Sequence, residues 1–111
     1  MGRTEQDRIL LAQITGLAYR YATAAPAGHS RAEAVTELTE LAAGRSDLLA
    51  EVAGISVGTH EGDPDEARYL AAAQLCLEAG ADQGAIPRWI AEGRGRADTI
   101  RPPHQTGHTA G

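Results

Sequence analysis

The sequence predicts an all-α fold: a bundle of four main helices around a central apolar helix at about residues 47–60, with a short fifth helix at the C-terminal end. Two observations support this class. Apolar residues recur at three- and four-residue intervals, without the alternation of a strand, and Gly, Pro and capping residues divide the chain into segments of helical length. A third observation identifies the central helix. Residues 48–59 carry one charged residue, Glu51, in a chain that is 23% charged, and so apolar a helix belongs inside.

Two ridges are expected along this central helix. One is apolar and consists of Leu48, Val52, Ile55 and Thr59. The other consists of Ala50, Gly54 and Gly58, at four-residue spacing. A glycine inside a helix costs about 1 kcal/mol relative to alanine. We therefore expect a neighbouring helix to pack closely against the second ridge and offset that cost.

Two helices are predicted before the central one, at about residues 4–23 and 30–44. Thr4 can cap the first, and the pair Ser30 and Glu33 has the spacing of a capping box that opens the second. The apolar residues expected to face inward are Leu10, Ile14, Leu17 and Tyr21 in the first helix and Ala34, Val35, Leu38, Leu41 and Ala42 in the second. Tyr19 and Ile9 lie off the first of these faces.

Two helices are predicted after it. Asp63 followed by Pro64 is a strong start signal, with Asp63 as the cap and Pro64 at the first helical position. This fourth helix is expected to run to Gly80, and its inward residues to be Leu70, Ala73 and Leu77. The fifth opens at residues 86–87 and should fray before residue 98. Residues 99–111 have nothing to bury and are expected to be disordered, which leaves a single domain at 1–98.

Composition narrows the classes of function. The chain has no Lys, Asn or Phe, as expected of a high-GC bacterial genome. Its net charge of −5 argues against non-specific binding to nucleic acid or to an anionic membrane. No signal peptide is visible and no apolar run approaches the roughly 20 residues of a membrane span, so we expect a cytoplasmic protein.

Residues 50–59 resemble the helix-turn-helix of bacterial repressors, in which Gly54 would form the turn and Ser56 would open the recognition helix. The pattern departs at His60 and Asp63, where that motif needs apolar residues. The segment that would enter the DNA groove is also acidic and would repel phosphates. We interpret residues 46–62 as a continuous buried helix with its following loop, and a DNA-binding transcriptional regulator is the alternative.

A second resemblance covers residues 48–62, 79–82 and 86–97, of which IPRWIAEGRGRA is the most specific part. These stretches are similar to a group of small uncharacterised helical proteins of high-GC Gram-positive bacteria. The group has no assigned activity, so the resemblance implies a source and a helical fold but no function.

The sequence offers little for catalysis. The four histidines are scattered, and His60 with the acidic residues that follow it reads as a solvated loop and helix cap. Cys76 lies on an alanine-rich helix and is expected to be a small core residue. No catalytic, metal-binding or phosphate-binding motif is present. We therefore expect no metal, no cofactor and no enzymatic activity, with a small enzyme as the second alternative.

The fifth helix carries the residues most suited to binding a protein. Trp89, the single Trp of the chain, lies between Arg88 and Ile90. Either Trp89 and Ile90 close the end of the bundle, or they present a Trp and an Arg, which are enriched at interaction hot spots, to a partner. We favour a protein that binds another protein or itself.

Self-association is expected from apolar residues left outside the inward faces. Leu75 lies opposite the predicted inward face of the fourth helix, close to Ala71 and Ala72. Together with an aromatic such as Tyr19, these residues would form an exposed apolar patch that needs a cover. A two-fold homodimer is the predicted outcome.

Overall fold

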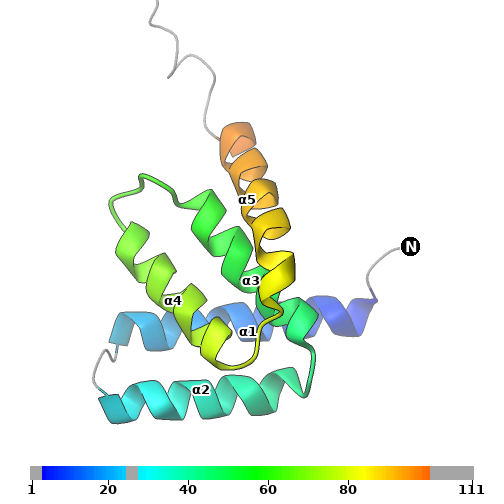
Figure 1. Cartoon of the computed structure of the whole chain (residues 1–111), viewed down its shortest axis with the longest axis vertical. Coiled ribbons are helices and arrows are strands. Elements are labelled where there is room, and N and C mark those ends of the chain that lie inside the picture. Colours follow the sequence, from blue (N-terminus) through cyan, green and yellow to red (C-terminus); the bar gives the residue numbers. More distant parts are fainter. Residues whose placement is uncertain (1–3, 25–27, 101–111) are drawn as a thin grey trace, which may run out of the picture.

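A computed structural model describes residues 4–24 and 28–100, and this part of the chain is all-helical (Figure 1). The elements in order are α1 (Glu5–Ala24), α2 (Gly28–Ala42), α3 (Ser46–Thr59), α4 (Glu66–Glu78), the short 3-10 helix η1 (Gln83–Ala85) and α5 (Ile86–Ile100). The predicted fold class is confirmed. Residues 101–111, most of the predicted disordered tail, lie outside the described residues.

The helix α3 is the centre of the fold. It contacts the other four α-helices, and most of its residues are buried. It is continuous through Gly54, as the sequence predicted, and ends at His60. Around it, α1 and α2 lie side by side as a pair, while α4 and α5 occupy the other half of the molecule (Figure 1).

The core is built largely from small side chains. Its fully or almost fully buried members outside α3 are Ile14 and Ala18 of α1, Ala34, Leu38 and Ala42 of α2, and Ala72 and Cys76 of α4. Alanine at so many core positions keeps the helix axes close, so that a chain without Phe still forms a packed interior.

The inward face of α4 differs from the predicted one. Leu70 is 45% exposed, whereas Leu75 is 5% exposed. The buried residues of this region are Ala72, Ala73, Leu75, Cys76 and Ala79. Ala73 is buried as predicted and Leu77 packs against the core. The prediction was wrong for Leu70 and Leu75, because small apolar residues surround α4 on several sides and the pattern alone did not fix which side faces inward.

The ends of α4 also show how the chain turns. The helix begins at Glu66, three residues after the predicted cap. Asp63 instead closes a turn, in which its Oδ1 accepts a hydrogen bond of 2.9 Å from the Asp65 amide. At the other end Gly80 has φ +110°, and the Ala81 amide donates to the Cys76 carbonyl at 3.1 Å. This C-cap, which needs a residue in the left-handed region, directs the chain towards η1.

The helix α5 packs on α3 at backbone distance. A Cβ atom on Gly54 would lie 2.9 Å from the Ile86 carbonyl oxygen, and one on Gly93 would lie 2.7 Å from the Ile55 carbonyl oxygen. A Cβ atom on Gly58 would overlap the Ile90 carbonyl oxygen. The predicted close approach to the Gly54–Gly58 ridge is confirmed. With this support α5 runs to Ile100, past the predicted fraying point.

Candidate functional site

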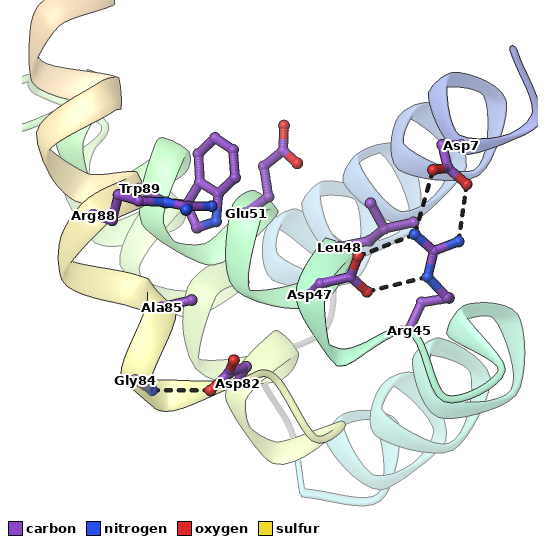
Figure 2. Close-up of a pocket in the computed structure, with 10 residues that line it drawn as sticks. All are labelled: Asp7, Arg45, Asp47, Leu48, Glu51, Asp82, Gly84, Ala85, Arg88 and Trp89. Atoms are coloured by element: carbon purple, nitrogen blue, oxygen red, sulfur yellow. Dashed lines mark hydrogen bonds and ion pairs between the residues drawn. The ribbon is translucent and has the colours of Figure 1, made fainter. Parts of the chain in front are cut away.

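The helices α1 and α5 both pack on α3 and run in different directions (Figure 1). Residues of all three helices line a groove at the surface. We call it the α1–α5 groove, and it consists of two hollows that share Glu51. The larger, of about 630 Å³, is lined by Asp7, Arg45, Asp47, Leu48, Glu51, Asp82, Gly84, Ala85, Arg88 and Trp89 (Figure 2). The smaller, of about 190 Å³, is lined by Leu11, Thr15, Tyr19, Glu51, Val52, Ile55, Ser56 and Arg96.

An ion-pair network holds one end of this groove together. Arg45, directly before α3, donates through Nη1 to Asp7 Oδ1 of α1 at 2.8 Å and through Nη2 to Asp47 Oδ2 at 3.0 Å. The guanidinium group lowers the pKa of the Asp47 carboxyl, and hydrogen bonds to the two carboxylates raise the pKa of Arg45. Two carboxylates around one guanidinium group leave this network with a net negative charge.

Glu51 is the charged residue at the centre of the groove. It is 5% exposed, although α3 is otherwise apolar over most of its length. Figure 2 shows its side chain on α3 between the indole of Trp89 and the helix that carries Asp7. A buried carboxylate costs folding free energy unless hydrogen bonds or ion pairs offset it. Glu51 lines both hollows and so lies where they meet.

The glycine ridge determines where Trp89 lies. Because Gly54 has no side chain, the backbone of α5 can approach α3 at Trp89, and the half-buried indole extends over the larger hollow (Figure 2). The Arg88 guanidinium carbon lies 4.7 Å from the centroid of the Trp89 ring, a cation–π contact. Asp82 accepts a 3.1 Å hydrogen bond from the Gly84 amide and so shapes the turn that leads into α5.

Tyr19 links the smaller hollow to the rest of the molecule. Its hydroxyl is 2.7 Å from the Ser56 Oγ of α3, and its ring meets the Tyr69 ring edge-on at 5.1 Å. Tyr69 in turn stacks on His60, whose Nδ1 lies 3.2 Å from Asp63 Oδ2. Burial raises the pKa of the Tyr19 hydroxyl. The chain of contacts connects α1, α3, α4 and the loop between α3 and α4.

The structure brings together three of the residues predicted to bind a partner. Trp89 and Arg88 line the larger hollow, and Tyr19 lines the smaller one. Ile90 is half-buried, with its backbone against the α3 glycines. Leu75 was predicted to be exposed, and this prediction was wrong. Leu75 is buried on α4 together with Ala72, so the exposed patch from which a dimer was predicted does not form.

Sequence reasoning missed the acidic residues of the groove. Asp7, Asp47 and Asp82 come from three separate segments of the chain, and the local sequence around each is typical of the start of a helix. The one available signal was Glu51, a lone charge in an apolar helix, which no packing argument required.

The two reactive side chains of the core show no activation. Burial raises the pKa of the Cys76 thiol to about 12, so the thiol stays protonated at neutral pH. The Ser56 hydroxyl is paired with a tyrosine hydroxyl, which is not a general base. Among the residues that the structure describes, no group of three or more His, Cys, Asp or Glu side chains could hold a metal ion. No helix within residues 4–24 and 28–100 is long and apolar enough to cross a membrane.

Gly54 lies inside a continuous helix, whereas the repressor motif requires a turn at that point. No family model, no curated protein and no solved structure matches this chain.

Proposed function

We propose that this is a non-enzymatic cytoplasmic protein that works by binding another protein, or a second copy of itself, in the α1–α5 groove. The supporting observation is that Trp89 and Arg88 from α5 and Tyr19 from α1 border the same groove. Trp, Tyr and Arg are the residue types most enriched at interaction hot spots. Because the side chains come from different helices, the fold rather than the local sequence brings them together.

The lining favours a protein over a small molecule as the ligand. Six of the ten residues around the larger hollow are charged: Asp7, Arg45, Asp47, Glu51, Asp82 and Arg88. Small-molecule sites are predominantly apolar with a few polar groups. An aromatic anchor surrounded by a charged rim is the usual composition of a protein interface.

Site-specific photo-crosslinking in the producing cells tests this proposal. Arg88 is replaced by p-benzoylphenylalanine, which places the reactive group at the edge of the groove. The matched control carries the same amino acid at Ala67, an exposed position of α4. We expect a covalent adduct to a polypeptide from position 88 and none from position 67. The mass of the adduct distinguishes another protein from a second copy of this chain.

Two outcomes would contradict the proposal. One is the absence of any adduct from position 88 while the variant remains folded by circular dichroism. The other is adduct formation of equal yield from both positions, which would show random collision and not a binding site.

A further inference from the structure

We infer that α5 is a hinged strap that undocks from α3 as a unit while α1–α4 stay folded, and that the α1–α5 groove is complete only while this strap is docked. The occupancy of the groove is then coupled to the docking of α5. This coupling rests on the proposed function, whereas the opening of the strap is a property of the free protein.

The apolar core of the described residues is complete without α5. Every member of its cluster of buried side chains lies on α1–α4 or directly after α4, and α5 adds the partly buried Ile86 and Trp89 at its edge. Ala97, the one buried apolar side chain of α5 among the described residues, lies outside that cluster. Because buried apolar contacts hold a cooperative unit together, α1–α4 keep what they need to stay folded when α5 leaves.

The contact of α5 with α3 is made by backbone atoms and not by large interlocking side chains. Gly54 and Gly58 of α3 and Gly93 of α5 bring the two backbones together. Glycines allow close contact but have no side chain, so this approach removes little apolar side-chain surface from water. The main contacts of α5 are with α3 and η1, and Figure 1 shows its C-terminal half extending beyond α1 and α2. Undocking therefore breaks one main helix–helix contact.

The sequence of α5 also forms a weak helix. Gly93 and Gly95 lie in its interior, where glycine is less favourable than alanine, and its last turn has no basic residue to complement the helix dipole. A short helix of this composition is marginal in water unless packing supports it. The helical conformation of α5 therefore depends on its contact with α3, and the two are lost together.

Two fastenings hold the docked position, one at each end. Before η1, the Asp82 amide donates to the Ser46 carbonyl at 3.1 Å. Towards the other end, Arg94 donates to both carboxylate oxygens of Glu61 at 2.8 and 2.7 Å, and both side chains are exposed. A bidentate pair fixes the geometry, but an exposed pair contributes little free energy. The pair of Arg94 and Glu61 is therefore a latch that can open, and the connection at residues 79–85 is the hinge.

The groove needs α5 in place. Trp89 and Arg88 line the larger hollow from α5, and Arg96 lines the smaller one, so undocking removes a wall from both. A partner that binds in the groove therefore suppresses the opening of α5, and weaker docking of α5 lowers the fraction of molecules that can bind.

Native-state hydrogen exchange of the free protein at low denaturant concentrations tests the strap without a partner. We expect the amides of residues 90–97 to share one opening equilibrium. It should be at least ~10-fold more open than that of core amides such as Ile14, Leu38 and Cys76, and it should depend less on denaturant because less surface is exposed.

Two matched ion-pair variants distinguish opening of the strap from global unfolding. Glu61→Gln removes the latch and should speed exchange in α5 about 2- to 5-fold. Glu78→Gln removes the pair between α4 and Arg31 of α2, which lies in the part that stays folded. It should speed exchange of the core amides and leave α5 unchanged, whereas both variants would speed exchange in α5 if that helix opened only by global unfolding.

A proline placed in each part gives a second test. Ala91→Pro, at an exposed position inside α5, removes a helix hydrogen bond and should abolish protection in α5 while the core amides stay protected. Thr36→Pro, at an exposed position inside α2, should unfold the whole chain.

The inference would be overturned if residues 90–97 opened only together with the core amides, if Glu78→Gln sped exchange in α5 as much as Glu61→Gln, or if Ala91→Pro unfolded the whole chain. The photo-crosslink at position 88 reports on the proposed function separately. A crosslinked partner together with purely global opening of α5 would refute the strap and leave the proposed function standing. A strap that opens as expected without any adduct from position 88 would refute the proposed function, and with it the coupling.

Discussion

At the residue scale, the hydrogen bond between Tyr19 and Ser56 is the polar contact that joins the groove to the core. Ser56 is 1% exposed, so its hydroxyl has little access to water. Removing one partner of such a pair costs more than removing both, because the remaining group loses its hydrogen bond while buried.

Tyr19→Phe should therefore lower the free energy of unfolding by about 1–2 kcal/mol. Ser56→Ala added to it should cost little more, since no orphaned hydroxyl is left. The control is Tyr21→Phe, whose hydroxyl bonds Glu37 Oε2 at the exposed surface, and it should change stability by less than about 0.5 kcal/mol. Denaturant unfolding of these three variants and of Ser56→Ala alone measures these differences. Additive losses for the two single substitutions would show that the pair is not coupled.

Cys76 gives a second residue-scale prediction. A fully buried thiol with a pKa near 12 should not react with a thiol reagent such as Ellman's reagent while the protein is folded. In denaturant it should react completely within the time needed for mixing. Rapid modification of the native protein would mean that α4 opens readily from the core.

At the scale of the elements, the attachment of α5 to α3 decides whether the groove exists. The contact is made by backbone atoms at Gly54, Gly58 and Gly93, and the indole of Trp89 is held over the larger hollow as a result. A methyl group added at these positions would meet backbone atoms, which cannot move aside as a flexible side chain can.

Gly58→Ala should destabilise the protein by about 1–3 kcal/mol, even though alanine has the higher helix propensity. Gly95→Ala, on α5 with nothing within 4 Å of the added methyl group, should instead stabilise it by about 0.5–1 kcal/mol. Thermal unfolding compares the two variants with the unchanged protein. Stabilisation by both substitutions would contradict the close packing of α5 on α3.

Two ion pairs between elements predict the response to acid. Arg94 of α5 bonds Glu61, and Arg31 of α2 bonds Glu78 of α4. Each guanidinium group lowers the pKa of its carboxyl below the ordinary value near 4.5. A carboxyl whose pKa is lowered by folding stabilises the protein above its unfolded pKa, and that stabilisation is lost as the pH falls through the folded pKa.

The contribution of these pairs should therefore be constant from pH 8 down to the ordinary carboxyl pKa near 4.5, and it should be lost as the pH falls through the lowered pKa values of the folded protein. Glu61→Gln should lower the melting temperature at neutral pH, and the difference from the unchanged protein should vanish in acid. Glu40→Gln, at an exposed position, is the control. Melting curves from pH 3 to pH 8 measure the effect, and a difference that does not shrink as the pH falls below 4.5 would contradict it.

At the scale of the whole molecule, the sequence predicted the elements better than their orientation. Gly44, Gly80 and Pro87 mark boundaries because backbone geometry restricts what can follow them, and these boundaries lie within a few residues of the observed ones. The predicted inward side of α4 was wrong for its leucines Leu70 and Leu75, because alanines on several sides of that helix give the apolar pattern no clear direction. Leu75 was expected outside and is inside.

The groove was predictable in part. Trp89, Arg88 and Tyr19 were identified from residue type and position, but the local sequence did not predict that α1 and α5 would both pack on α3. That arrangement depends on the glycine ridge of α3, which fixes the position of α5, and on the ion pairs from Arg45 to Asp7 and Asp47. Residues 7, 45 and 89 are far apart in the sequence but line the same hollow, and the periodicity of a single helix cannot predict such an arrangement.

The most direct test of the α1–α5 groove as the binding site is backbone hydrogen exchange, measured on the protein alone and on its complex with the partner captured by the photo-crosslink at position 88. We predict slower exchange in η1, in the first turns of α5 and in the part of α1 that carries Asp7 and Leu11, since these segments line the groove. Exchange in α2 should be unchanged and serves as the internal reference. Protection confined to α2 or to the exposed side of α4, or no protection in the groove segments, would contradict the assignment of the site.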